Sequence, residues 1–175
     1  MILTGPQIGE RVKDGGIRID PFDPTLLQPN SYDFHLSRRI GWYTDDVLDC
    51  ARENPFEEHP LPDDGMVLLP DRIYLGSTVE RIGSDHYAPI IRAKSSVARL
   101  GLFVHVTADL IDIGSYGQLT LQLHAVQPVR VYPGMLIGQV TFWTPEGEIT
   151  LYDGKYQGSD GPRPSQIHRD FEADR

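Results

Sequence analysis

Glycine and proline divide this chain into short segments, and this constrains its fold more than any other feature of the sequence. The 175 residues include 17 glycines and 14 prolines, and both residue types interrupt helices and central strands. Between them, several segments alternate apolar and polar residues as half-buried strands do. Many short strands at this spacing predict an all-β fold, a sandwich or barrel of jelly-roll type.

The alternating segments predict particular strands and turns. Examples of the expected strands are Arg72–Val79, Leu119–Ala125, Val129–Tyr132 and Met135–Phe142. On the first of them, Ile73, Leu75 and Val79 share one face. Pro133-Gly134 predicts a tight turn between the last two strands. Residues Glu53–Asp64 are acidic and interrupted by prolines, which indicates a surface excursion.

The two ends of the chain differ from this strand-rich middle. Residues Met1–Gly16 predict a short helix, with Thr4 as N-cap, Gln7 at a capping-box spacing and Gly15-Gly16 as its stop. Residues 154–175 are polar, rich in glycine and poor in core formers. We therefore expect them to form a flexible C-terminal tail with no packing partner in its own subunit. The length predicts a single domain over residues 1–175.

Composition excludes several classes of function. The net charge is −9 with no basic run, so binding to a nucleic-acid polymer is not expected. A few local cations can still hold a single nucleotide triphosphate, particularly with a metal ion. The longest apolar run is too short to cross a membrane, and no signal-peptide pattern opens the chain, so no membrane association is expected. Cys50 is the only cysteine, which fits a cytoplasmic protein without disulfides.

Metal-based catalysis is not indicated by the residues. The six histidines are scattered and make no close grouping with cysteine or carboxylates, so a zinc site is not expected. Zinc deaminases need a His/Cys/Cys set and a nearby glutamate, and neither element is found. His105 and His124 stand in apparent strands, where a histidine is more typical of a core or an interface. No Walker loop, GxGxxG fingerprint or GxSxG elbow occurs.

Two clusters could carry the chemistry of a phosphorylated sugar. Lys94, Ser95, Ser96 and Arg99 combine hydroxyls, backbone N–H groups and a planar guanidinium that suits phosphate oxygens. The same residues would also suit a polar turn before an apolar strand. Asp112 stands in a tight turn and could accept a hydrogen bond from a sugar hydroxyl or position a water. It could equally cap its own turn.

A third candidate lies in the tail. Lys155, Tyr156 and Gln157 combine a cation, an aromatic ring and an amide between glycines. Such a segment could close over a bound nucleotide as a lid that becomes ordered on binding. A frayed C-terminus has the same composition, so both interpretations stay open.

Taken together, long segments of the chain resemble the dCTP deaminases, whose superfamily also contains the trimeric dUTP diphosphatases. The segments are ILTGPQI at the start, IDPFDPTLLQPNSYDFHL (Ile19–Leu36), LGSTVE (Leu75–Glu80), KSSVARLGLFVHVTA (Lys94–Ala108), IDIGSYGQLTLQL (Ile111–Leu123), PGMLIGQ (Pro133–Gln139) and GKYQGSDGPRPS (Gly154–Ser165). The resemblance implies a distorted jelly-roll or β-barrel of the β-clip type, assembled as a homotrimer with active sites at subunit boundaries. It also implies zinc-free hydrolytic deamination of dCTP to dUTP, in some members on to dUMP.

The resemblance also implies roles for single residues. The ligand would be a pyrimidine deoxynucleoside triphosphate, dCTP or dUTP, with Mg²⁺ carried by the triphosphate and dTTP as a possible inhibitor. The expected phosphate- and water-positioning residues are Ser95, Ser96 and Arg99, with Lys94 beside them. The backbone of Thr107 and Ala108 would read the pyrimidine, Asp112 would meet the 3′-hydroxyl, and Lys155 and Gln157 would belong to the closing tail near Tyr152.

The chain departs from the family at the residue that matters most for catalysis. Gln122 stands where the deaminases carry a glutamate that takes a proton from water and delivers it to the cytosine ring. An amide cannot accept and return a proton at neutral pH, so we expect deamination to be slowed by orders of magnitude. Ser115, Asp109 and Ala125 also depart from the pattern around the base and sugar, which puts the identity of the substrate in question.

Three hypotheses follow. The first is a dCTP deaminase impaired by Gln122, whether that residue is natural or engineered. The second is a dUTPase-like diphosphatase in which Asp112 positions water at the α-phosphate and no glutamate is needed. The third is a non-catalytic trimer, or one with altered specificity, that binds a pyrimidine nucleotide without turnover.

Overall fold

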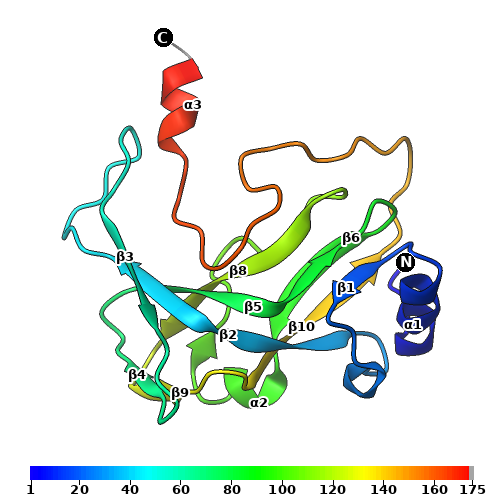
Figure 1. Ribbon diagram of the computed structural model, residues 1–175, viewed down its shortest axis with the longest axis horizontal. Helices are drawn as coiled ribbons and strands as arrows, with labels where there is room; N and C mark the ends of the chain where they lie inside the picture. The colour runs from blue at the N-terminus through cyan, green and yellow to red at the C-terminus, as the bar shows by residue number, and fades with distance from the viewer. Residues whose placement is uncertain (174–175) are drawn as a thin grey trace.

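In the computed structural model, which describes residues 1–173, the chain forms a strongly curved, nearly closed antiparallel sheet with short helices at its margins (Figure 1). The main path of the sheet is β6 (Ala88–Ala93), β10 (Leu136–Trp143), β2 (Tyr32–Tyr43), β5 (Tyr74–Gly83), β8 (Tyr116–Ala125) and β7 (Leu102–Phe103). The remaining strands are β1 (Arg18–Asp20) on β5, β3 (Phe56–Pro60) on β2, and the separate pair β4 (Met66–Leu68) and β9 (Val129–Val131). The all-β, barrel-like fold class predicted from the sequence is confirmed.

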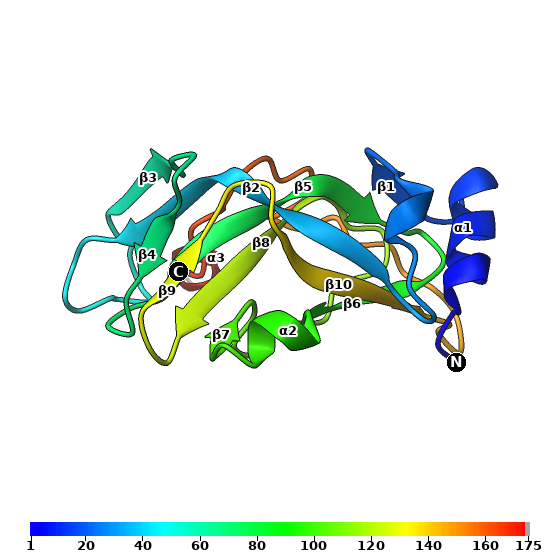
Figure 2. The same ribbon diagram turned by 90° about the horizontal axis from the view of Figure 1, so that it is seen from below.

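The helices are short. They are α1 (Gly5–Lys13), the 3₁₀ turn η1 (Pro24–Leu26), α2 (Ser95–Ala98) and α3 (His168–Ala173). Figure 2 shows α1 at one end of the sheet and α2 beside β7 on its lower side. Within residues 1–173, no helix has the length and apolar character needed to cross a membrane.

The core lies inside the curve of the sheet. The long strand β2 contributes Tyr32, Phe34, Leu36 and Ile40, all of which are inaccessible to solvent. The first three recur at every second residue, as expected for side chains on one face of a strand. Buried leucines of β8 and Phe142 of β10 complete the same cluster.

Strand β8 is both a wall of the core and the platform of the candidate site. Its residues alternate strictly between buried and half-exposed from Tyr116 to Ala125. Leu119, Leu121 and Leu123 point into the core, so the polar residues between them, Gln122 included, face the opposite side. The predicted strand is confirmed and begins three residues earlier than the pattern indicated.

The predicted face of Arg72–Val79 is wrong. The strand runs instead over Tyr74–Gly83, and of the three residues assigned to its apolar face only Leu75 is buried, while Ile73 and Val79 are 43% and 37% exposed. The strand lies between β2 and β8, and both of its faces are covered over Tyr74–Thr78. The register of β5 is irregular against both neighbours: against β2 the shift falls between Gly76 and Thr78, and against β8 it falls between Ser77 and Arg81.

The other predicted elements are confirmed with smaller changes. Strands β9 and β10 match the alternating segments, and Pro133-Gly134 forms the turn between them, with Gly134 at a φ of +73°. Residues Glu53–Asp64 are largely exposed but are more than an excursion, because β3 pairs with β2 there. Sequence reasoning missed β3 because acidic residues and prolines hide the alternation.

Helix α1 begins after Thr4, as the sequence predicted, but the Thr4 side chain makes no capping hydrogen bond. Pro6 occupies the second helical position and has no N–H to offer. The free N–H of Gly5 instead donates to the Pro29 carbonyl at 2.9 Å. The helix ends at Lys13, and Gly15 follows with a φ of +81°, which agrees with the predicted glycine stop.

Candidate functional site

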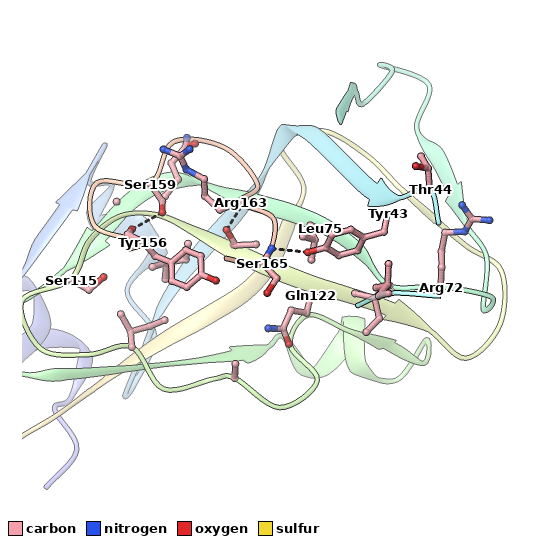
Figure 3. Close-up of a pocket in the computed structure, with 18 of the residues that line it drawn as sticks. Tyr43, Thr44, Arg72, Leu75, Ser115, Gln122, Tyr156, Ser159, Arg163 and Ser165 are labelled. Atoms are coloured by element: carbon pink, nitrogen blue, oxygen red, sulfur yellow. Dashed lines mark hydrogen bonds between the residues drawn. The ribbon is translucent and has the colours of Figure 1, made fainter. Parts of the chain in front are cut away.

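A cavity of about 830 Å³ opens on the polar face of β8 (Figure 3). Three parts of the chain enclose it besides β8: the loop before β8, the C-terminal tail, and the region around the ends of β2 and β5. The principal lining residues are Gln118, Thr120 and Gln122 from β8, Ala108, Ile111 and Ser115 from the loop, Tyr156, Ser159, Arg163 and Ser165 from the tail, and Tyr43, Asp71 and Arg72 from the strand ends.

Gln122 points from β8 into this cavity (Figure 3). Its backbone N–H donates to the Val104 carbonyl at 3.0 Å. Its side-chain oxygen Oε1 accepts a hydrogen bond from the Val106 N–H at 3.2 Å. The segment after β7 therefore lies along β8 at this point and holds the amide by one end.

The C-terminal tail has a packing partner in its own subunit, so the expectation that it has none is wrong. The Gln118 N–H donates to the Ser159 carbonyl at 2.9 Å, and the Gly158 N–H donates to the Tyr116 carbonyl at 3.1 Å. Gly117 permits this approach, since a β-carbon there would lie 2.7 Å from the Ser159 nitrogen. The composition concealed the contact because the tail is held by backbone groups rather than by apolar side chains.

Further along, side chains of the body fix the tail. The Gly161 N–H donates to Gln118 Oε1 at 2.6 Å, and the Arg163 N–H donates to Thr120 Oγ1 at 3.0 Å. The Ser165 N–H donates to the Tyr43 hydroxyl at 2.6 Å. Burial raises the pKa of Tyr43 above that of a free tyrosine. These contacts form one wall of the cavity.

The predicted tail residues mainly make contacts within the chain. Gln157 bridges the tail to the loop before β8: its Oε1 accepts from the Tyr116 N–H at 2.9 Å and its Nε2 donates to the Gly114 carbonyl at 2.9 Å. Lys155 Nζ pairs with Asp170 at 2.6 Å. The Tyr152 hydroxyl accepts from the backbone N–H of Tyr156 at 3.1 Å. A nucleotide contact from Lys155 or Gln157 would therefore require the release of these partners.

Within a single copy of the chain, the predicted phosphate cluster lies outside the cavity. Ser95, Ser96 and Arg99 are exposed on and just after the single-turn helix α2, and none of them lines the cavity. Lys94 pairs with the buried carboxylate of Asp33. The Lys94 charge is thus neutralised inside the protein, whereas Arg99 is turned to solvent.

Of the remaining predicted residues, some line the cavity and others do not. Ala108 lines the cavity, while Thr107 is exposed and does not. Asp112 is exposed in the predicted turn, where its backbone carbonyl accepts from the Ser115 N–H at 3.1 Å. Over residues 1–173 no donor reaches the Asp112 carboxylate, so it does not cap its own turn in this structure. Gly114 supplies the positive φ of +93° that the turn requires.

Sequence reasoning missed the residues around Tyr116. The guanidinium of Arg18 lies 4.6 Å from the centre of the Tyr116 ring and that of Arg81 lies 5.5 Å from it. These residues come from β1, β5 and β8, so no local pattern joins them. Cation–π contacts of this kind fix the ring at the start of β8.

His105 lies in the segment between β7 and β8, next to Arg92. Burial and then the positive charge of Arg92 lower the pKa of His105. Arg92 itself pairs with Asp109. Asp109, a departure from the deaminase pattern, thus has a structural partner in this chain.

Comparison with known proteins identifies the family. The family model described as dCTP deaminase-like matches residues 2–145. A dUMP-forming dCTP deaminase of Leptospira biflexa is 41% identical over 173 residues, which cover 98% of this chain and 99% of that protein. The enzyme of the same description from Clostridium beijerinckii is 42% identical with the same coverage.

A solved structure agrees at the level of the fold. The 2′-deoxycytidine 5′-triphosphate deaminase of Agrobacterium tumefaciens superposes with a TM-score of 0.63 at 22% identity, over 81% of this chain and 47% of that one. The whole-chain sequence identity, the family model and the curved sheet agree with the resemblance seen in the sequence. This chain belongs to the dCTP deaminase family.

Proposed function

We propose that this chain binds a pyrimidine deoxynucleoside triphosphate against β8 and catalyses zinc-independent hydrolytic deamination of dCTP, at a rate limited by Gln122. The observation that carries the proposal is the Gln122 side chain, which reaches from the polar face of β8 into the 830 Å³ cavity. A cavity of this size, lined by both apolar and polar side chains, suits a ligand as large as a nucleotide.

The reaction explains why Gln122 should limit the rate. Water adds to C4 of cytosine, and its oxygen must give up both protons as it becomes O4 of the product. One proton goes to the ring nitrogen N3, and the second goes to the amine, which departs as ammonia. A carboxylate at position 122 could transfer these protons, because it can be protonated and deprotonated near neutral pH. The Gln122 amide can only orient the water or the ring. Loss of proton transfer by a positioned group costs about 10²- to 10⁴-fold in rate.

We further propose a homotrimer in which neighbouring copies complete each site. The predicted phosphate groups Ser95, Ser96 and Arg99 are exposed and outside the cavity that holds Gln122. Leu110, which lines the cavity, is an apolar side chain that is 61% exposed, and Phe103 on β7 is 49% exposed. A second copy that covers these side chains could bring its phosphate cluster to the cavity.

The proposal includes Mg²⁺ as part of the substrate. Across the described residues, no three His, Cys, Asp or Glu side chains are grouped so that they could hold a metal ion. Mg²⁺ commonly keeps several waters and binds through the phosphates of a nucleotide, so such a protein cluster is not needed. The metal would neutralise phosphate charge, and the residues of the chain would orient the base and the sugar.

Product analysis tests the proposal. The chain is incubated with dCTP and Mg²⁺ near neutral pH, and dUTP, dUMP and ammonia are quantified over time. We expect slow deamination that rises about 10²-fold or more in Gln122→Glu. Gln127→Glu is the matched control, because Gln127 is exposed and outside the cavity. Absence of ammonia release from both the parent and Gln122→Glu would refute the deaminase proposal.

A dUTPase-like diphosphatase is the second candidate. It is favoured by the exposed Asp112 carboxylate, which is available to position a water. The relatives described as dUMP-forming make the combination of the two activities reasonable for this family. The test is release of diphosphate from dUTP with Mg²⁺, lost in Asp112→Asn. Tight Mg²⁺-dependent binding of nucleotides without any product would instead support a non-catalytic binding trimer.

A further inference from the structure

The orientation of the Gln122 amide is fixed by its contact with Val106. A backbone N–H can only donate a hydrogen bond, so the amide atom that faces it must be the oxygen. That contact is 3.2 Å long. The choice between oxygen and nitrogen at the end of this side chain is therefore set by the fold.

The amide nitrogen Nε2 is consequently left for the cavity. In the part of the chain that the structure describes, no acceptor lies within hydrogen-bonding distance of Nε2, whereas Oε1 has its partner. Gln122 is half-buried and lines the cavity. A ligand that places a hydrogen-bond acceptor against these two N–H groups is bound more favourably. A ligand that places another donor there is bound less favourably, because the donors on both sides are left unpaired.

A glutamate in the same pose would present the opposite polarity. One carboxylate oxygen would accept from the Val106 N–H, and the second would face the cavity as an acceptor. Pyrimidine bases also differ in whether the group on C4 donates or accepts a hydrogen bond. Cytosine carries an amino group there, which donates, and uracil and thymine carry a keto oxygen, which accepts.

We infer that Gln122 is a specificity-determining residue that makes this site prefer a 4-keto pyrimidine nucleotide, dUTP or dTTP, over dCTP. The inference rests on the proposed function, in which the side chain at position 122 works at C4, the reacting atom. Nε2 then donates to O4 of the keto base and opposes the 4-amino group of cytosine. The same amide that slows deamination thus also weakens binding of its substrate relative to its product.

Binding of slowly hydrolysed nucleotides tests this directly. The α,β-imido analogues of dUTP, dTTP and dCTP are titrated with Mg²⁺ into the parent chain by calorimetry near neutral pH. We expect the keto analogues to bind about tenfold or more tightly than the dCTP analogue. Gln122→Glu should abolish or reverse that preference, and Gln122→Ala should bring the analogues close to equal affinity. Gln127→Glu should keep the parent's preference.

The outcomes separate the inference from the proposed function. If the dCTP analogue binds the parent as tightly as the keto analogues or more tightly, the inference is overturned, while a nucleotide site remains. A preference that survives in Gln122→Ala also overturns it, because the discrimination would then come from another residue. If none of the analogues binds, both the proposed function and the inference fail.

Discussion

The docking of the C-terminal tail on β8 can be tested at Gly117. A β-carbon at this position would lie 2.7 Å from the nitrogen and 2.8 Å from the oxygen of Ser159, and 3.2 Å from the carbonyl carbon of Gly158. All three are backbone atoms, which cannot turn aside as the end of a long side chain could. Gly117→Ala should therefore displace the tail from β8.

The magnitude follows from the hydrogen bonds on either side of the contact. Two backbone bonds would be broken or lengthened, Gln118 N–H to Ser159 at 2.9 Å and Gly158 N–H to Tyr116 at 3.1 Å. At about 0.5–1.5 kcal/mol for each bond, docking should weaken by about 1–3 kcal/mol. Gly117 does not have a positive φ, so alanine itself introduces no backbone strain, and the loss should fall on the tail rather than on the sheet.

Hydrogen exchange followed by mass spectrometry measures this effect. Because tail undocking is a local opening, amides of residues 156–166 should exchange roughly 5- to 150-fold faster in Gly117→Ala, while β10 remains protected. Gly9→Ala is the matched control, since a β-carbon there meets only the end of the Leu27 side chain, at 3.1 Å. Unchanged tail exchange in Gly117→Ala would refute the idea that the backbone contact at Gly117 holds the tail.

Three further predictions concern the core, a buried polar contact and pH. Phe34→Ala should lower the free energy of unfolding in urea by about 3–5 kcal/mol, because Phe34 is fully buried; a loss below about 1 kcal/mol would contradict its central place in the core. Glu80 is 1% exposed and accepts from the His35 backbone N–H at 3.0 Å, so Glu80→Ala should cost about 1–3 kcal/mol in the same assay. Glu80→Gln, which keeps an acceptor, should cost less, and equal losses would argue against the hydrogen bond. Burial and Arg92 lower the pKa of His105, so the unfolded chain binds more protons and stability should fall as pH drops below about 6.5. His105→Gln should flatten that fall in pH-dependent melting, and an unchanged profile would contradict it.

Local patterns were sufficient for much of the fold. The segment Leu119–Ala125 alternates without interruption, so its strand and its buried face could be predicted. Pro133-Gly134 and the glycines after α1 mark chain reversals that depend on only a few residues. Long matching segments also indicate the dCTP deaminase family, and the family model and the relatives confirm it.

Other features depended on partners far away in the sequence. The face of β5 was mispredicted because consecutive residues Tyr74–Thr78 are all buried, so both faces of the strand are covered there and the alternation of a half-buried strand is lost. The pairing of Lys94 with Asp33 joins residues 61 positions apart, so a residue predicted to bind phosphate proved to have an internal partner. The contact of the tail with Gly117 likewise joins two distant segments through backbone atoms, for which side-chain composition gives no signal.

At Gln122, one property follows from the amino-acid sequence and another follows only from the tertiary structure. The amino-acid sequence alone establishes that position 122 holds an amide on the polar face of a strand, and therefore that it cannot transfer protons as a carboxylate would. Which end of the amide faces the cavity depends on the folded chain. Its oxygen is held by the N–H of Val106, 16 residues earlier in the chain, and a hydrogen bond between two separate segments exists only after the chain has folded.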